Sequence, residues 1–229
     1  MKNTVESSPL SLEHWQEINR KVTWGHYYHG EEAIEKAYVQ TINETRELWE
    51  NKIIQEGDTV LDVGSGNGRI AFGLQSYPIE KYYGLEAIKQ SVKFCKRSFK
   101  RDRRFQFIWM DLKNEQYNPK GKLEPAQFRV SLQSGSVNAV ICMSLFSHLE
   151  TVSVARKYVD EIYRLLKPGG RFFSSWFRSP PNTVNEDPFR TVYPEATILE
   201  IMENFNIYKE RGGKTDGFND QWCLFALKE

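Results

Sequence analysis

Short apolar segments alternate with helical segments through the middle of the chain, and this alternation is the strongest constraint on the fold. The apolar segments are TVLDVG (residues 59–64), YYGLE (82–86), FQFIWMD (105–111), VNAVICMS (137–144) and RFFSSWF (171–177). Between them, apolar residues recur at helical spacing over about 68–75, 88–100 and 152–166. Buried strands that alternate with helices form βαβ units, in which a parallel sheet is covered on both faces. The sequence therefore predicts an α/β fold.

The two ends of the chain add elements to this sheet. Near the N-terminus, helical spacing over about 12–20 and 31–54 flanks the aromatic segment TWGHYYHG (23–30). Near the C-terminus, a helix near 195–204 precedes strand-like segments near 206–209 and 222–227. We expect these last two segments to form an antiparallel edge hairpin.

The length of 229 residues fits one domain of ordinary size. We therefore expect an N-terminal helical cap segment over 1–56 and one compact domain over 57–229. The aromatic segment between the N-terminal helices allows two interpretations of its role. It either closes over a ligand as a lid or packs on the sheet as scaffold.

The charge balance limits the partners of the protein. Thirty-one Lys and Arg face thirty Asp and Glu, which leaves a net charge of +1, so the chain lacks the positive field of a phosphate-backbone binder. This argues against nucleic acid as a partner. No apolar segment has the length of a signal peptide or a membrane span, and the three cysteines are widely spaced. The sequence predicts a cytoplasmic protein without membrane contact.

A glycine-rich turn follows the first strand and marks a ligand site. Residues 60–69 read VLDVGSGNGR, and glycines at 64, 66 and 68 permit positive φ and a close approach of a ligand to the backbone. The spacing is GxGxG, whereas dinucleotide-binding turns read GxGxxG. Asp62 lies two residues before the first glycine. A carboxylate there would repel a pyrophosphate and attract an ammonium or sulfonium group.

This stretch resembles motif I of the class I S-adenosylmethionine-dependent methyltransferases. Further segments resemble later motifs of that family in the correct order, including the end of the third strand at Asp111-Leu112 and the LKPGG segment at 166–170. The resemblance covers about residues 57–177. It implies a Rossmann-like, seven-stranded, mostly parallel sheet with an antiparallel C-terminal edge hairpin and N-terminal helices. It also implies S-adenosylmethionine as cofactor and S-adenosylhomocysteine as product.

The resemblance assigns roles to residues at the strand ends. Glu86 follows the glycines by about twenty residues, where Rossmann-like folds hold ribose hydroxyls. Asp111 and Leu112 match the family position that binds adenine. The full set of predicted cofactor residues is Asp62, Gly64, Ser65, Gly66, Gly68, Glu86, Ala87, Asp111, Leu112, Met143 and Ser144.

The fourth strand end bears on the methyl acceptor. Residues 143–148 read MSLFSH, which lacks the Asn/Asp-Pro-Pro-aromatic pattern of enzymes that methylate DNA amines. It also lacks the acidic and amide ligands of Mg-dependent O-methyltransferases, so we expect no metal. His148 is the titratable group of this loop and suits a general base for a hydroxyl, although packing beside the cofactor is an equal alternative. Tyr27, Tyr28, Tyr117 and Phe146 are the candidate substrate contacts.

The loop YNPKG at 117–121 and the SLFSH segment also resemble a branch of the family associated with glycan and polar-metabolite methylation. The resemblance implies O-methylation of a hydroxyl on a sugar or another small polar metabolite, and hence a small-molecule or glycan acceptor. Two alternatives stay open. One is N-methylation of a small amine, a protein or RNA, and the other is a non-catalytic S-adenosylmethionine-binding module. The sequence leaves the oligomeric state open.

Overall fold

The computed structural model describes residues 31–179, 190–212 and 221–229. The helices are α2 (Glu31–Glu50), α3 (Arg69–Leu74), α4 (Lys89–Ser98), α5 (Val152–Leu165) and α6 (Glu195–Ile201), with two 3-10 turns, η1 (Pro125–Gln127) and η2 (Phe146–His148). The strands are β1 (Thr59–Val63), β2 (Lys81–Glu86), β3 (Phe105–Trp109), β4 (Val137–Cys142), β5 (Leu166–Trp176), β6 (Arg178–Ser179), β7 (Tyr193–Pro194), β8 (Phe205–Arg211) and β9 (Trp222–Lys228). The predicted alternation of strands and helices is thus confirmed.

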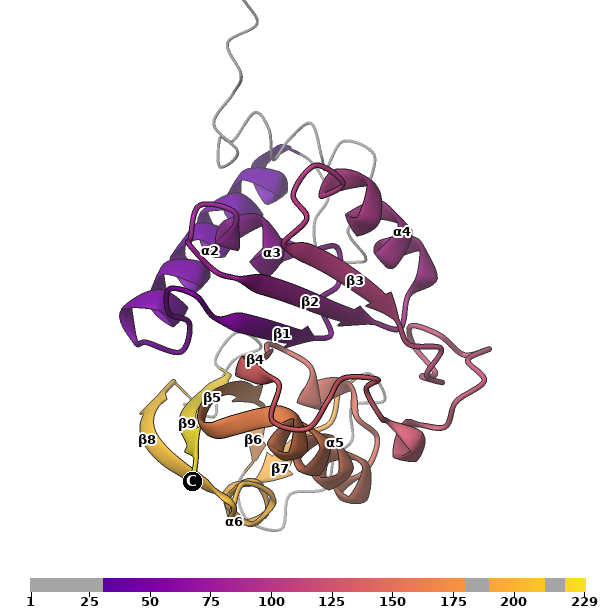
Figure 1. The fold of residues 1–229 in the computed structure, drawn as a ribbon. Coiled ribbons are helices and arrows are strands. Elements are labelled where there is room, and N and C mark those ends of the chain that lie inside the picture. The colour runs from indigo at the N-terminus through magenta and orange to yellow at the C-terminus, as the bar shows by residue number, and fades with distance from the viewer. Residues whose placement is uncertain (1–30, 180–189, 213–220) are drawn as a thin grey trace, which may run out of the picture.

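Seven strands form one sheet in the order β3-β2-β1-β4-β5-β9-β8 (Figure 1). β1 pairs in parallel with both β2 and β4, and β4 pairs in parallel with β5. β9 runs antiparallel to β5 and β8. The structure therefore confirms the predicted mostly parallel sheet with an antiparallel C-terminal edge hairpin. The strand order reverses between β1 and β4, and open α/β sheets bind ligands at the carboxyl ends of the strands beside such a reversal.

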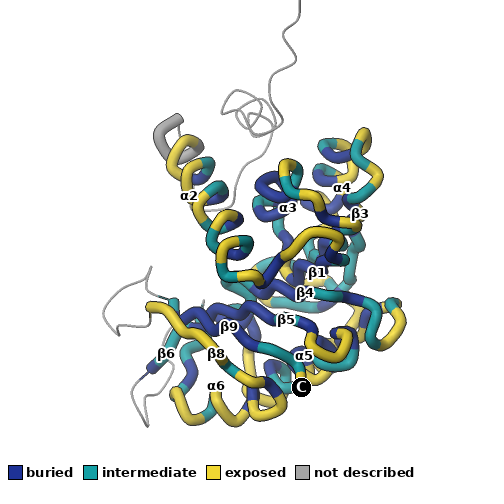
Figure 2. Tube along the Cα trace, turned by 60° about the vertical axis from the view of Figure 1, so that its left-hand side comes forward, coloured by how far each residue is buried: buried dark blue, intermediate teal, exposed yellow. Residues whose placement is uncertain are grey.

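Two hydrophobic cores cover the two faces of the sheet. One contains α2, α3 and α4 side chains and the other contains α5 and α6 side chains, as the placement of these helices in Figure 1 shows. Neighbouring residues of β1 point to opposite cores, with Val60 in the first and Leu61 in the second. Because both faces are covered, the central strands are buried along nearly their whole length (Figure 2). This explains the continuous apolar segments of the sequence.

Helix α2 packs into the same core as the strands. Its Ala37 and Leu48, followed by Ile53 and Ile54, are buried beside Val60 of β1. The described part of the predicted cap segment is therefore continuous with the core of the sheet. The predicted helix over about 12–20 and the segment 23–30 lie outside the described residues, so the boundary at residue 56 stays a prediction.

The turn after α5 differs from the sequence expectation. The sequence predicts a helix over about 152–166 and a strand from about 171, whereas α5 ends at Leu165 and Leu166 already pairs with Val137 of β4. Lys167 precedes a proline, which disfavours helical backbone at that residue. Gly169 then takes a positive φ of 69°, and the register shifts before Arg171 pairs with Ala139. The whole segment is thus the irregular start of β5.

None of the helices in the described ranges is long and apolar enough to cross a bilayer. Cys95, Cys142 and Cys223 are buried and unpaired with one another. Their burial agrees with a role as small apolar side chains.

Candidate functional site

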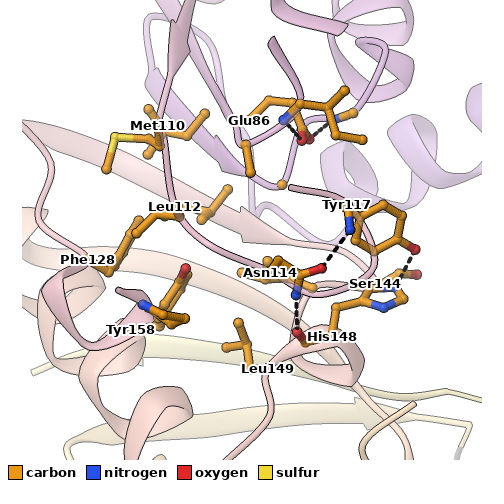
Figure 3. Close-up of a pocket in the computed structure, with 18 of the residues that line it drawn as sticks. Glu86, Met110, Leu112, Asn114, Tyr117, Phe128, Ser144, His148, Leu149 and Tyr158 are labelled. Atoms are coloured by element: carbon orange, nitrogen blue, oxygen red, sulfur yellow. Dashed lines mark hydrogen bonds between the residues drawn. The ribbon is translucent and has the colours of Figure 1, made fainter. Parts of the chain in front are cut away.

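A cavity of about 280 Å³ opens at the carboxyl ends of β1, β2, β3 and β4 (Figure 3). Its lining includes seven of the predicted cofactor residues, together with Tyr117 and His148: Gly64, Gly66, Glu86, Ala87, Leu112, Met143 and Ser144. The cavity has an apolar end and a polar end. Glu86 lies between them on the β2 side, and the polar end is formed by the loops after β3 and β4 (Figure 3).

The glycine turn supplies one wall of this cavity. The backbone N–H groups of Gly64 and Ser65 both donate to the Leu85 carbonyl at 2.9 Å, which ties the turn to β2. Gly66 has a φ of 54°, and a Cβ there would meet no atom within 4 Å. Glycine is thus required by the backbone conformation, and the space in front of it is open for a ligand. Ser65 and Gly68 hold the turn but do not line the cavity.

Glu86 is a charged group on the β2 side of the cavity, whose lining also includes Lys113 and Glu150. One carboxylate oxygen accepts from the Gly66 N–H at 2.8 Å, and the other accepts from the Ile88 N–H at 2.7 Å. Burial raises the pKa of Glu86, and these backbone hydrogen bonds oppose that shift. A carboxylate has about four lone-pair positions, so this one can still accept a hydrogen bond from a ligand. The arrangement therefore fits a diol such as a ribose.

Four side chains form the apolar end, which is called the apolar slot below. Met110 and Leu112 follow β3, Phe128 comes from the long loop after it, and Tyr158 comes from α5. The rings of Phe128 and Tyr158 stack with centroids 3.8 Å apart and an interplanar angle of 5°. Sequence reasoning missed Met110, Phe128 and Tyr158. The available signal for Phe128 was an aromatic residue followed by apolar Val130 and Leu132 inside a largely polar insert.

Asp111 is held at the edge of this slot and does not line the cavity. The Asn118 side-chain amide donates to Asp111 at 3.2 Å and to the Leu112 carbonyl at 2.9 Å. A Cβ at Gly121 would lie 2.5 Å from the Lys113 nitrogen, so only glycine permits this close contact of two backbones. These contacts explain the YNPKG segment as a clamp that fixes the residues after β3.

Asp62 lies beneath the glycine turn and away from the cavity. Its side chain is buried and accepts a hydrogen bond from the Tyr82 hydroxyl at 2.5 Å. Burial raises the pKa of Asp62 from 3.8 to about 7, although the Tyr82 hydrogen bond lowers it. The structure places Asp62 against Tyr82 of β2, and its predicted contact with the cofactor stays a prediction.

Asp62→Asn is expected to remove a pH dependence of stability. Between pH 3.8 and about 7, the folded state holds a proton that the unfolded state releases, so stability falls as the pH rises through this window. The loss is on the order of a few kcal/mol, because one pKa unit corresponds to about 1.4 kcal/mol. Urea unfolding at pH 5 and pH 8 measures the difference. The exposed Asp160→Asn variant is the control, and an equal pH dependence in wild type and Asp62→Asn would contradict the assignment.

The polar end joins His148 to the loop after β3 (Figure 3). The Tyr117 hydroxyl lies 3.4 Å from His148 Nε2, and the two rings meet edge to face. The Asn114 amide donates to the His148 carbonyl at 3.0 Å and accepts from the Tyr117 N–H at 2.9 Å. Asn114, which sequence reasoning missed, therefore fixes both residues in place.

His148 is suited to accept a proton. Burial and the nearby positive charge of Arg190 lower the pKa of His148 below 6.5, so the imidazole is neutral at pH 7. Its Nδ1 is buried and has no hydrogen-bond partner among the described residues. A neutral imidazole at the end of a ligand cavity can take a proton from a bound hydroxyl.

Of the remaining substrate candidates, Phe146 does not line this cavity. Phe146 is fully buried and stacks on Trp176 with ring centroids 3.8 Å apart. The structure thus places Phe146 in the core and not on the cavity wall. Tyr27 and Tyr28 lie outside the described residues.

Within the part of the chain that the structure describes, no group of three or more His, Cys, Asp or Glu side chains could hold a metal ion. The cavity offers the half-buried carboxylate of Glu86, a neutral imidazole and a phenol. These groups fit an adenosine-containing ligand at Glu86 and the apolar slot, with a proton acceptor at the other end.

Comparison with known proteins agrees with this site. Residues 61–174 match the family model described as a methyltransferase domain. The fold is similar to an S-adenosylmethionine-dependent methyltransferase from Methanosarcina mazei, with a TM-score of 0.60 and 14% identity over 79% of this chain and 96% of that one. It is also similar to magnesium protoporphyrin IX methyltransferase from Synechocystis with bound S-adenosylmethionine, with a TM-score of 0.61 and 18% identity over 95% of this chain and 90% of that one.

A third similar structure is named for an activity other than methyl transfer. The (4+2)-cyclase SpnF has a TM-score of 0.65 and 14% identity, over 96% of this chain and 93% of that one. At this identity the likeness concerns the fold alone. The acceptor chemistry must therefore be argued from the residues of the cavity.

Proposed function

Since the chain is a class I S-adenosylmethionine-dependent methyltransferase, we propose that it methylates a hydroxyl group on a sugar or another small polar metabolite. The observation that carries this proposal is the pairing of Tyr117 with a neutral His148 at the polar end of the cavity. A hydroxyl must lose its proton as its oxygen takes a methyl group, whereas a neutral amine is already nucleophilic. A proton acceptor at this position favours the hydroxyl.

Different residues of the cavity are assigned to different parts of the cofactor. Glu86 would hold the ribose of the cofactor, with Gly66 beside it, and the slot at Met110, Leu112 and Phe128 would hold the adenine. Ala87, Met143 and Ser144 complete the wall. When bound, the cofactor supplies a methyl group on a sulfonium. Transfer of this methyl to a hydroxyl oxygen yields a methyl ether and S-adenosylhomocysteine and releases the proton of the hydroxyl.

His148 is the group we assign to that proton. Tyr117 orients the imidazole through the contact at Nε2, and Asn114 fixes the backbone of His148. Because the pKa of His148 is lowered, the ring is ready to accept a proton at neutral pH without first losing one. Tyr117 and Asn114 act as positioning residues. The reaction also needs water to be excluded from the cavity.

A panel of acceptors tests the proposal. The enzyme is incubated with S-adenosylmethionine and, separately, with methyl glycosides, inositols, small primary amines, a basic peptide and transfer RNA, and S-adenosylhomocysteine release is measured. We expect release with a glycoside or an inositol, and an O-methyl signal in the NMR spectrum of the product. Release with the amines, the peptide or the RNA alone would favour the N-methyltransferase alternative. Binding of S-adenosylmethionine without release for any acceptor would favour the non-catalytic module.

A further inference from the structure

A second cavity, of about 720 Å³, lies between α2 and the ends of β5 and β9. Its volume is within the range of small-molecule sites, which is about 300 to 1,000 Å³. It shares Met143 and Ser144 with the first cavity, so the two meet at the end of β4. The cofactor residues discussed above, Glu86 and the apolar slot, belong to the first cavity alone. The second cavity is therefore a separate space that borders the same strand end.

Ser144 stands at the boundary in a conformation that is rare for a residue with a side chain. Its φ is 57°, one of two positive values for non-glycine residues among those described. Two residues of the second cavity hold it there: the Ser144 N–H donates to Ser175 Oγ at 2.7 Å, and the Gln221 amide donates to Ser144 Oγ at 2.8 Å. Backbone strain of this kind persists where surrounding contacts enforce it, and it is common at ligand sites. The conformation of Ser144, at the boundary of the two cavities, is thus held by residues that line the second cavity.

The lining of the second cavity is rich in amides and hydroxyls. Gln40 and Asn43 project from α2, and Gln221, Ser144 and Ser175 face them from the strand ends. Each amide and hydroxyl can both donate and accept hydrogen bonds, as a sugar hydroxyl does.

The charges around this cavity are largely paired with one another. Glu47 pairs with Arg211 at 2.6 Å, and Glu44 pairs with Arg69 at 2.6 Å. The lining carries three acids, Glu35, Glu44 and Glu47, against two cations, Lys36 and Arg211. This excess of negative charge disfavours a phosphorylated acceptor. Uncharged hydroxyl groups match the lining better than an anion does.

We propose that the second cavity binds the methyl acceptor and that this acceptor is an uncharged polyhydroxylated molecule whose reactive hydroxyl lies at Ser144. The inference rests on the proposed function, because it takes the reaction to be methylation of a hydroxyl. It adds the place of binding, the absence of charge on the acceptor, and Asn43 and Gln40 as residues that determine specificity.

Binding of simple probes tests the inference without turnover. The protein saturated with S-adenosylhomocysteine is titrated with uncharged methyl glycosides and inositols, and with choline, and the amide resonances of Ser144, Ser175 and Gln221 are followed by NMR. We expect at least one uncharged polyol to shift these resonances. Asn43→Leu should weaken its binding about three- to tenfold, the effect of a lost neutral hydrogen bond. Affinity for S-adenosylhomocysteine should not change.

Arg46→Leu is the matched control, because Arg46 donates to Asn43 from outside the cavity at 2.9 Å. It removes this contact while leaving the amide of Asn43 in place, so polyol binding should match wild type. If no polyol shifts the three resonances, or if Asn43→Leu binds the polyol as wild type does, the inference is wrong. Choline binding in place of the polyols would also overturn it. An O-methylated product whose acceptor KM is unchanged in Asn43→Leu would refute this site and leave the proposed function standing.

Discussion

Glu86→Ala is expected to weaken binding of S-adenosylhomocysteine about ten- to a hundredfold. Hydrogen bonds to a charged group contribute about 1.5 to 3 kcal/mol, and the carboxylate is placed to accept from a ribose diol. The substitution also removes the acceptor for the Gly66 and Ile88 N–H groups, which line the same cavity. Titration calorimetry with S-adenosylhomocysteine measures the change directly and needs no knowledge of the acceptor.

Two further variants separate ribose binding from support of the turn. Glu86→Gln keeps one acceptor oxygen and the size of the side chain, so its affinity should fall between those of wild type and Glu86→Ala. Glu80→Ala removes an exposed acid at the start of the same strand region and should bind as wild type does. If Glu86→Ala remains folded and binds S-adenosylhomocysteine with unchanged affinity, the ribose lies elsewhere.

The contrast between Glu86 and Asp62 shows what the sequence could and could not predict. Both are acids near the end of a predicted strand, and the sequence assigned both to the ligand. Glu86 is the last residue of β2, so its side chain extends beyond the sheet edge into the cavity. Asp62 is the next-to-last residue of β1, between Gly84 and Ile141 of the neighbouring strands, and its carboxylate is buried against Tyr82. A difference of one position in the strand, together with the neighbouring strands, decides whether the carboxylate lines the cavity or is buried against Tyr82.

The motif residues were predictable because they act through local backbone geometry. A β-branched strand followed by glycines specifies the turn wherever it occurs, and the alternation of strands and helices specifies the sheet. The apolar slot was not predictable in the same way. Phe128 and Tyr158 lie thirty residues apart in sequence and meet only because α5 packs beside the loop after β3. Phe146 looked equally available, but its position in η2 directs it onto Trp176 in the core.

The choice of methyl acceptor depends on fewer residues than the fold or the apolar slot does. A fold that serves methyltransferases and, in SpnF, a cyclase does not determine which reaction occurs. What can differ between such proteins is the set of groups beside the cofactor. In this chain we propose His148, Tyr117 and Ser144 as those groups, and they reach the cavity from two different loops. The role of His148 is therefore the most direct test of the proposed chemistry.

His148→Ala is expected to lower kcat about 100- to 10,000-fold, the usual effect of removing a general base. The rate of S-adenosylhomocysteine release is measured with the best polyol acceptor of the panel. Affinity for S-adenosylhomocysteine should stay near that of wild type, because Glu86 and the apolar slot are untouched. Tyr117→Phe removes the hydroxyl that contacts Nε2 and should lower kcat by a smaller factor, since the imidazole itself remains.

The pH profile distinguishes a general base from a residue that only packs beside the cofactor. A base acts in its neutral form, and burial lowers the pKa of His148 below 6.5. The wild-type rate should therefore be constant around neutral pH and fall as the pH drops through that lowered pKa. In His148→Ala this acid limb should disappear together with most of the rate. If the variant instead keeps both kcat and the acid limb while binding S-adenosylhomocysteine more weakly, His148 packs against the cofactor and another group takes the proton.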